Sequence, residues 1–455
     1  MRLTVAGTGY LGLTHAVCMA DLGHEVLAID SDHKKIAMAA GGEVPFFEPG
    51  LEPLLRKSLE TGRLRFTTSY QEIAEFGDVH FLCVGTPEAE QGAADLRHVH
   101  AAADALAPYL TCEDLVVGKS TVPVGTARKL LQRFSVTDAA GGQADVAWNP
   151  EFLREGHAVH DTLHPDRLVF GVTSDRAEMR LRKVYDQPLA TGIPCLVMDL
   201  ETAELVKVAA NAFLATKISF INAMADACDA VGADVILLAE ALAHDERIGR
   251  HCLRPGLGFG GGCLPKDVRG FRAAAMSLGI NSVASLLSDV NAINQNRRAQ
   301  VADMACEAVG GRLAGKRVAV LGAAFKPNSD DIRDSPSLDV SERLARQGAI
   351  VSVHDPVALA NAVRLKPELH YAQSISDAAA GAHLVLHLTE WAEYRAIDPF
   401  ALAAIVAERN LIDARCALDA RLWRSAGWSV RVLGRPPGFS DKAVPAARPD
   451  SAAAE

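Results

Sequence analysis

The chain has 455 residues, more than one ordinary domain, and its content of 49% hydrophobic and 22% charged residues is typical of a soluble globular protein. Its net charge of −10 argues against a nucleic-acid binder, which needs a basic face. No apolar run reaches the roughly 18 to 20 residues that span a bilayer. The nine cysteines are scattered without a CxxC pair, which favours reduced thiols in a cytoplasm over disulfides or a metal site.

Residues 1–200 alternate short apolar segments with helical stretches, as in a doubly wound parallel α/β sheet. Residues 3–6 are expected to form a strand. They are followed by the glycine run Gly7-Thr8-Gly9-Tyr10-Leu11-Gly12, a helix to about residue 22 and a second strand over residues 25–30. This order of strand, glycine turn, helix, strand and acid is that of a dinucleotide site.

Each residue type in this unit has a physical reason. Gly7 permits the tight turn, Gly9 lets a pyrophosphate approach the backbone, and Gly12 lets helix and strand pack. Asp30, 18 residues after Gly12, is expected to bond the ribose hydroxyls and to repel a 2′-phosphate. The unit therefore predicts NAD rather than NADP as the cofactor.

Further strands are expected over residues 79–84, 115–118 and 145–148. Each ends in a loop that is polar or contains glycine, over residues 85–87, 120–126 and 149–152. Ligands of open parallel sheets lie at the carboxyl ends of the strands, so these loops are candidate site elements.

Residues 201–305 form a second region, a central helical region that we expect to mediate dimerisation. Residues 201–231 read as one long helix with apolar residues on nearly every side, which predicts a buried helix. Lys207 and Asn211 are four residues apart and share a face of that helix. A lysine there must meet an anion or be neutralised; the alternative is a buried stem with its head in solvent.

A single cysteine, Cys263, follows a run of glycines and precedes Leu264-Pro265-Lys266-Asp267. Pro265 suits the first turn of a helix, whose free N–H groups would favour the thiolate and make the sulfur nucleophilic. Asp267 is close enough along the chain to act on a water or an alcohol proton beside that sulfur. The alternative is a glycine turn around a buried structural thiol.

Residues 306–435 repeat the alternating pattern, with strands expected over 318–322, 351–355, 384–388, 411–413 and 430–433. The fold class is therefore α/β, with two doubly wound, Rossmann-like domains joined by a long central helix. The second domain lacks the glycine fingerprint, so we expect a different ligand there. Residues 436–455, rich in Pro, Ala and Asp, are expected to be a disordered tail.

Several motifs occur together in one order. They are the amino-terminal glycine run, Ser120-Thr121-Val122-Pro123, the segment from Asn149 to Gly156, Lys207 with Asn211, the glycine-cysteine loop up to Asp267, and Phe325-Lys326-Pro327 followed by residues 331–335. Together they closely resemble the UDP-glucose/GDP-mannose (nucleotide-sugar) 6-dehydrogenase family over the whole chain except the tail. The resemblance implies a cytoplasmic enzyme that oxidises a sugar C6 alcohol to a carboxylate with two NAD⁺, as a dimer or a multiple of dimers.

The resemblance also implies residue roles. Cys263 forms the thiohemiacetal and thioester, Lys207, Asp267 and a water act on the alcohol proton, and Lys207 and Asn211 stabilise oxyanions. Glu151 assists hydrolysis with Thr121 beside it. Cofactor contacts are implied for Gly7, Gly9, Tyr10, Leu11, Gly12, Asp30, Lys35, Thr86, Thr121, Glu155 and Arg333. Substrate contacts are implied for Phe152, Leu153, Lys207, Asn211, Arg247, Phe259, Gly260, Lys326 and Arg415.

The form of the cysteine loop resembles that of glucose-type enzymes more than that of enzymes for N-acetylated sugars, but it does not distinguish the nucleotide. The resemblance implies UDP-glucose as the substrate, with TDP-glucose or GDP-mannose as alternatives. Two positions depart from the common family pattern. Ala223 stands where a Glu is frequent, and Gly262 where a Ser is frequent. Two rival functions stay open: a two-electron hydroxyacid-type dehydrogenase, which needs no cysteine, and a non-catalytic NAD-binding regulatory protein.

Overall fold

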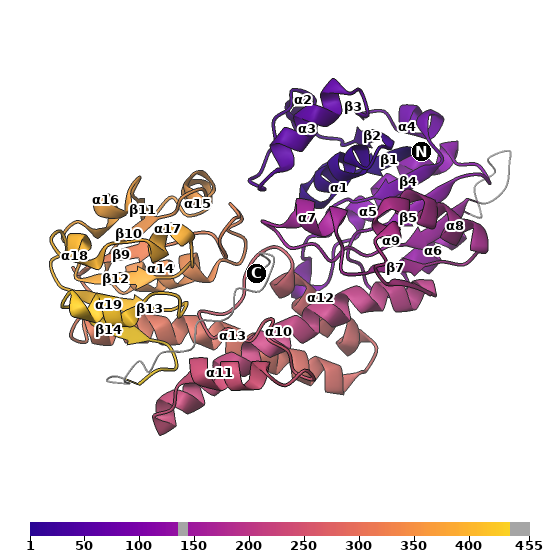
Figure 1. The fold of residues 1–455 in the computed structure, drawn as a ribbon. Coiled ribbons are helices and arrows are strands. Elements are labelled where there is room, and N and C mark those ends of the chain that lie inside the picture. Colours follow the sequence, from indigo (N-terminus) through magenta and orange to yellow (C-terminus); the bar gives the residue numbers. More distant parts are fainter. Residues whose placement is uncertain (135–143, 437–455) are drawn as a thin grey trace. The chain divides into compact units, whose positions relative to one another are not determined.

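The computed structural model describes residues 1–134 and 144–436, and the chain divides into two compact units (Figure 1). Unit 1 comprises Met1–Ala210 with Ala273–Leu278, and unit 2 comprises Asn211–Arg272 and the chain from Gly279 onward. Residues 437–455 of the expected tail lie outside the described residues.

Unit 1 contains an eight-stranded sheet of order β3-β2-β1-β4-β5-β6-β7-β8, in which every neighbouring pair is parallel except β6 and β7. The predicted doubly wound sheet is confirmed, and the strand order reverses between β1 and β4. Strands β3, β7 and β8 were not expected. The strands are β1 (Arg2–Ala6), β2 (Glu25–Ile29), β3 (Leu64–Thr67), β4 (Val79–Leu82), β5 (Leu115–Gly118), β6 (Asp145–Trp148), β7 (Leu168–Gly171) and β8 (Cys195–Met198).

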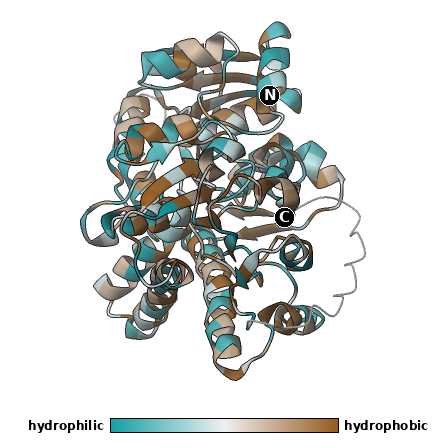
Figure 2. Cartoon of the chain, turned by 90° about the vertical axis from the view of Figure 1, so that its left-hand side faces the viewer, coloured by the Kyte–Doolittle hydropathy of each residue, from teal (hydrophilic) through white to brown (hydrophobic). Residues whose placement is uncertain are grey.

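The central strands of this sheet are buried on both faces, because helices connect parallel strands over each side, whereas the edge strand β8 is partly exposed. Leu3 and Val5 of β1 belong to one apolar cluster, while Ala6 belongs to the other. The brown strands of Figure 2 reflect this near-continuous hydrophobicity. The connecting helices are α1 (Tyr10–Asp21), α2 (His33–Ala40), α3 (Leu51–Glu60), α4 (Tyr70–Phe76), α5 (Arg97–Leu106), α6 (Thr126–Phe134), α7 (Ala158–Leu163), α8 (Asp175–Val184) and α9 (Asp186–Ala190), with short 3₁₀ turns at Glu90–Gly92 and Ala107–Tyr109.

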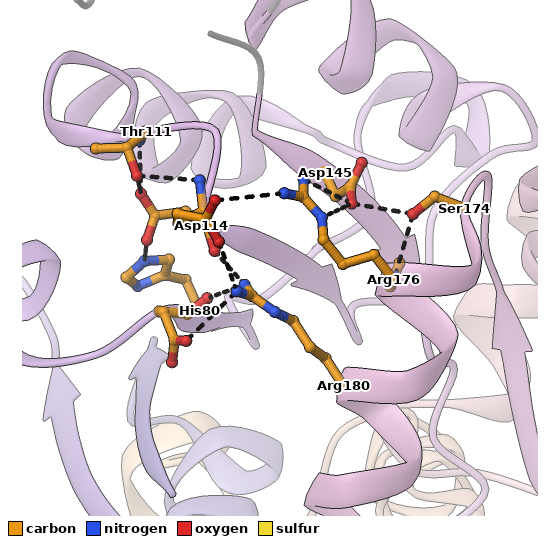
Figure 3. Close-up of polar contacts among 10 residues, drawn as sticks. His80, Thr111, Asp114, Asp145, Ser174, Arg176 and Arg180 are labelled. Carbon is orange, nitrogen blue, oxygen red and sulfur yellow. Dashed lines mark hydrogen bonds and ion pairs between the residues drawn. The ribbon is translucent and has the colours of Figure 1, made fainter. Parts of the chain in front are cut away.

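Charged side chains at the amino-terminal ends of β5 and β6 neutralise one another (Figure 3). His80 Nε2 lies 3.3 Å from Asp114 Oδ1, and Arg176 Nε donates to Asp145 Oδ2 at 3.0 Å. Arg180 of α8 donates to the carbonyls of Glu113 and Asp78. This edge is thereby braced, and the carboxyl ends of the strands remain the candidate ligand side.

The predicted central helix is α10 (Leu200–Val231), and it runs from unit 1 into unit 2. Leu200 and Ala203 join a core of unit 1, while Ala215 and Ile221 belong to two cores of unit 2. The expected burial on all sides is wrong, because neighbouring elements cover only part of an apolar surface that runs around the helix. Exposed apolar residues are Leu205 (40%), Phe213 (65%) and Phe220 (47%).

Contrary to the expectation from apolar runs, α10 has the length and hydropathy of a membrane span, and it alone among the described residues. Its interior positions include Lys207 and Asn211, both buried, and its apolar residues supply cores of both units. We therefore interpret it as a core helix. The other helices of this central region are α11 (Val235–Ala243), α12 (Leu264–Ser277) and α13 (Asn281–Ala308).

Unit 2 contains a six-stranded parallel sheet of order β11-β10-β9-β12-β13-β14, so the second doubly wound domain is confirmed. The five expected strands are present, and the two-residue β11 is additional. The strands are β9 (Arg317–Leu321), β10 (Ile350–His354), β11 (His370–Tyr371), β12 (Leu384–His387), β13 (Asn410–Asp413) and β14 (Ser429–Val432). The helices are α14 (Pro336–Arg346), α15 (Leu359–Leu365), α16 (Ile375–Ala379), α17 (Ala392–Arg395), α18 (Pro399–Leu402) and α19 (Ala420–Ser425).

Candidate active site

The glycine run connects β1 to α1 at the point where the strand order reverses. Gly7 has φ +96°, and a Cβ on Gly12 would lie 1.8 Å from the carbonyl oxygen of Gly7. A Cβ on Gly9 would meet nothing within 4 Å. No side chain caps the amino end of α1, so its first N–H groups are available to a bound anion. The backbone is thus tightly packed at Gly7 and Gly12 and leaves open space at Gly9, as the approach of a pyrophosphate requires.

Asp30 follows β2 and accepts hydrogen bonds at 2.8 Å from the Thr8 N–H and at 3.1 Å from the Thr8 hydroxyl. Burial opposes ionisation, but the N–H groups of Asp32 and Thr8, with the charge of Lys35, lower the pKa of Asp30 below its ordinary value. The carboxylate is therefore ionised near neutral pH. An ionised acid at this position accepts from ribose hydroxyls and repels a 2′-phosphate.

Tyr10 connects the glycine run to the segment that follows β6. Its hydroxyl donates to Glu48, whose carboxylate also accepts the N–H groups of Gly156 at 2.7 Å and Ala158 at 2.8 Å. Burial, with Glu48 beside it, raises the pKa of Tyr10, so the phenol stays neutral. Glu155 is buried in the same segment. Side chains far apart in the sequence therefore hold the two loops in one arrangement.

The loop after β4 and the loop after β5 are joined in the same way. The Thr86 hydroxyl donates to the Thr121 carbonyl at 2.8 Å, and Ser120 donates to the Val84 carbonyl at 2.7 Å. Thr86 is buried and Thr121 is half-buried. The expected cofactor residues of unit 1 thus lie on loops at the carboxyl ends of β1, β2, β4, β5 and β6 or, for Tyr10, Leu11 and Gly12, in the first turn of α1. Lys35 differs, because it is exposed on α2.

Lys207 forms an ion pair with Glu151, with Nζ and Oε1 2.9 Å apart. The two side chains are only 6% and 10% exposed. The other Glu151 oxygen accepts the Leu153 N–H at 2.8 Å, and Lys207 Nζ lies 5.7 Å from the centre of the Phe152 ring. The lysine therefore meets an anion inside unit 1, and the alternative of an ammonium reaching solvent is wrong.

Unit 2 carries the cysteine. Cys263 is exposed and directly precedes α12, in which Pro265 is the second residue, as the sequence predicts. The alternative of a buried structural thiol is therefore wrong. One turn later Asp267 is buried, and its two oxygens contact Asn211 Nδ2 and Lys266 Nζ, each at 2.6 Å. The sulfur thus lies at the amino end of a helix, beside a carboxylate that is paired on both oxygens.

The glycines before Cys263 are needed for close packing. Gly258 has φ +96°, and a Cβ there would lie 2.3 Å from Asn294 Oδ1. Asn294, on α13, accepts the Phe259 N–H at 2.8 Å and donates to the Phe259 carbonyl at 3.0 Å. A Cβ on Gly260 would lie 2.5 Å from the Asp334 carbonyl oxygen. The loop is therefore pinned by α13 on one side and by the Asp334 segment on the other.

The departure at Gly262 has a structural consequence. Its N–H donates to Asp331 Oδ2 at 3.2 Å, and Asp331 also accepts from Arg333. A Cβ on Gly262 would lie 2.1 Å from the guanidinium carbon of Arg333, so a side chain here would have to displace that exposed guanidinium. The departure at Ala223 has no explanation in the structure.

The carboxyl edge of the second sheet differs from that of the first. Asp355 occupies the place after β10 that Asp30 occupies after β2, but its oxygens accept the N–H groups of Ala323, Ala324, Val357 and Ala358. It is fully buried. A carboxylate so occupied has little capacity for ribose hydroxyls, which agrees with the expectation of a different ligand.

Of the expected substrate residues in unit 2, Arg415 hydrogen-bonds to the backbone of the surrounding loops. Its guanidinium donates to the carbonyls of Leu388, Gly258 and Phe325 at 2.7, 3.2 and 3.0 Å. Arg415 thereby links the cysteine loop to the loop that carries Lys326. By contrast, Arg247 is exposed and pairs with Asp245, two residues before it in the chain.

Sequence reasoning missed three buried polar residues that hold these loops, and it placed Asn149 in a motif without giving it a role. The three are Asn294 and Arg298 on α13 and Lys119 after β5. Arg298 donates to the carbonyls of Phe259 and Asp334. For Lys119 the available signal was a charged side chain at the end of an apolar strand, whereas α13 is rich in polar residues and gave no signal for Asn294 or Arg298.

Comparison with known proteins places three family models in order along the chain. They are the NAD binding domain, central domain and UDP binding domain of the UDP-glucose/GDP-mannose dehydrogenase family, at residues 1–189, 201–296 and 319–420. UDP-glucose 6-dehydrogenase YwqF of Bacillus subtilis is 40% identical over 92% of this chain and 93% of its own length. The Rhizobium meliloti UDP-glucose 6-dehydrogenase is 39% identical over 96% and 100%. The solved UDP-glucose dehydrogenase of Pyrobaculum islandicum superposes with a TM-score of 0.86, at 38% identity, over 94% and 98%.

Proposed function

The chain belongs to the UDP-glucose/GDP-mannose dehydrogenase family and is an NAD-dependent dehydrogenase, and from this premise we propose that it oxidises UDP-glucose at C6 to UDP-glucuronate through a thioester on Cys263. The observation that carries the proposal is the exposed Cys263 at the amino end of α12, one turn before Asp267. A two-electron dehydrogenase needs no such sulfur.

NAD⁺, when bound to the amino-terminal domain, supplies the hydride acceptor for both oxidations. Asp267, through a water that Lys207 helps to orient, takes the proton of the C6 alcohol while its carbon loses hydride, giving an aldehyde. The Cys263 thiolate adds to the aldehyde carbon to form a thiohemiacetal. Loss of a second hydride gives the thioester, and the hydroxyl proton leaves to solvent.

Hydrolysis completes the reaction. Water adds to the thioester carbon and gives one proton to Glu151, the C–S bond breaks, and the thiolate of Cys263 leaves. Lys207 and Asn211 stabilise the oxyanions along this path, and Thr121 positions the water. Buried donors are suited to this work, because their charge is less screened than in water.

We assign the binding residues on the same grounds. The residues that we assign to cofactor binding are Gly7, Gly9, Tyr10, Leu11, Gly12, Asp30, Lys35, Thr86, Thr121, Glu155 and Arg333. The residues that we assign to nucleotide-sugar binding are Phe152, Leu153, Lys207, Asn211, Arg247, Phe259, Gly260, Lys326 and Arg415. The division into residues 1–200, 201–305 and 306–435 is part of the same proposal.

We further propose a soluble, cytoplasmic homodimer or multiple of dimers. The support is the apolar surface left on α10 by its neighbours, at Leu205, Phe213 and Phe220. Burial of such a surface in a second copy removes it from water. Sedimentation of the purified chain tests the assembly, and a monomer at micromolar concentration would overturn it.

The decisive experiment for the reaction is incubation with NAD⁺ and a panel of nucleotide sugars, followed by mass identification of the product. The expected result is UDP-glucuronate with two NADH formed per acid. Oxidation of TDP-glucose or GDP-mannose in preference would correct the substrate alone. Formation of one NADH per sugar with a free aldehyde as the product would overturn the thioester mechanism.

A further inference from the structure

Lys119 is a buried lysine that the proposed reaction leaves unused. It follows β5 directly, in unit 1, and only 7% of its surface is exposed. Its ammonium donates to Asn149 Oδ1 at 2.9 Å, to the Asn149 carbonyl at 3.4 Å and to the Tyr185 hydroxyl at 3.3 Å. All three acceptors are neutral. A lysine is seldom buried without a carboxylate partner, because the charged form loses its hydration.

Asn149 joins three strands. Its backbone N–H donates to the Gly118 carbonyl at 2.8 Å, and its side-chain amide donates to the Val169 carbonyl at 3.0 Å. Its Oδ1 accepts both the Lys119 ammonium and the Tyr185 hydroxyl, the latter at 2.6 Å. Pro150 comes next and restricts the backbone, so Glu151 is placed by a short, stiff connection. A shift of Asn149 is therefore passed on to the Glu151 carboxylate.

The charges around Lys119 come from several elements. Burial lowers the pKa of Lys119 to about 8, while Cys83 after β4 and Glu151 after β6 raise it and Lys207 of α10 lowers it. His15 of α1 stays neutral, because burial and then the Lys119 charge lower its pKa. Burial raises the pKa of the Tyr185 phenol, which also stays neutral. With a pKa of about 8, Lys119 is thus mostly an ammonium near pH 7.

We propose that Lys119 is a positioning residue for Glu151: it holds Asn149 in place and adds a second buried cation behind the Glu151–Lys207 pair, and so keeps the Glu151 carboxylate where the hydrolytic water needs it. This inference rests on the proposed function, in which Glu151 takes a proton from the water that hydrolyses the thioester. Lys119 acts only through Glu151. Its loss therefore slows hydrolysis and spares the two hydride transfers.

The test uses the full-length protein with Lys119→Met, which keeps the length of the side chain and removes its charge. Rapid mixing with UDP-glucose and NAD⁺ should give a burst of two NADH per active site, followed by a steady-state rate about 10²-fold below wild type, the lower end of what a general base contributes. The accumulated thioester should be visible by mass spectrometry of the acid-quenched protein.

Two comparison variants isolate the role. Tyr185→Phe removes a neutral hydroxyl that accepts from Lys119 and donates to Asn149 Oδ1. Asn149 keeps its bonds to the Lys119 ammonium and to the Val169 carbonyl, so the steady-state rate should stay within about 3-fold of wild type. Glu151→Gln should reproduce the burst and the slow phase. Adding Lys119→Met to it should cost little more, because the lysine acts through that carboxylate, whereas a purely structural lysine would give additive losses. If Lys119→Met does not fold, Lys119→Gln replaces it. Gln lacks the charge but still donates to Asn149, so the burst should be followed by a fall in the steady-state rate that is smaller than about 10²-fold but larger than that of Tyr185→Phe.

A Lys119 variant that hydrolyses the thioester at the wild-type rate, or one that loses burst amplitude and turnover in proportion, overturns the role of Lys119. Wild-type protein that yields one NADH per sugar and no thioester overturns the proposed function instead. The two failures are therefore distinguishable from one set of progress curves.

Discussion

Replacement of Lys207 by alanine separates catalysis from packing. The change removes the Nζ atom that lies 2.9 Å from Glu151 Oε1, in a pair whose side chains are 6% and 10% exposed. Breaking a buried pair by removing one partner typically costs about 3–5 kcal/mol. We expect a cost of about 3 kcal/mol, at the lower end of that range, because Glu151 keeps its hydrogen bond from the Leu153 N–H. For a unit the size of unit 1 this lowers the Tm of its unfolding by about 6 to 12 °C.

The catalytic effect of the same change is separate. Loss of one oxyanion donor typically lowers kcat by about 10²- to 10³-fold. The Kd of the nucleotide sugar should change by only a few-fold, because most of the substrate is held elsewhere. Calorimetry, steady-state kinetics and equilibrium binding on one preparation measure the three quantities.

The matched control is the double variant Lys207→Ala with Glu151→Gln. It removes the buried carboxylate that the single variant leaves without its lysine, so most of the lost Tm should return, while kcat should remain low. An unchanged kcat in the single variant would refute the assignment of Lys207. A fall in Tm that the double variant does not recover would refute the ion-pair account of the stability loss.

The remaining predictions concern the cofactor, the sulfur and the loop. NADP⁺ should be a poor substitute for NAD⁺, and Asp30→Ala should narrow the difference in kcat/KM; equal activity of the wild type with both cofactors would remove Asp30 from ribose recognition. Cys263→Ser should fold and bind both ligands but lose most turnover, and alkylation of the wild type should map to Cys263 and be blocked by UDP-glucose; full activity of the serine variant would make the sulfur dispensable. Gly258→Ala should lose activity and stability beyond the control Gly310→Ala, because both glycines have φ near +90° but only a Cβ on Gly258 meets the Asn294 side chain, at 2.3 Å. Equal losses in the two variants would show that backbone strain alone matters.

The sequence by itself determined the parts of this protein that depend on short stretches of chain. The glycine run, the acid after the second strand and the start of a helix at Pro265 are local backbone requirements, so they were visible before the fold. The two parallel sheets followed from the alternation of strands and helices. The resemblance also named Cys263 and Lys207, because motifs in a shared order carry information that no single residue type carries.

Only the tertiary structure decided which of these residues meet. Lys207 pairs with Glu151, and Asn211 with Asp267, each across more than fifty residues of sequence. Asn294 pins the cysteine loop and Lys119 holds Asn149, although neither belongs to a recognisable motif. The exposure of Phe213 could not be predicted from the sequence either, since an apolar residue is expected to be buried until its neighbours are known. The physical reason is common to all: a side chain's partner and its burial depend on strand order and helix packing, which bring distant segments together, and local periodicity does not encode them.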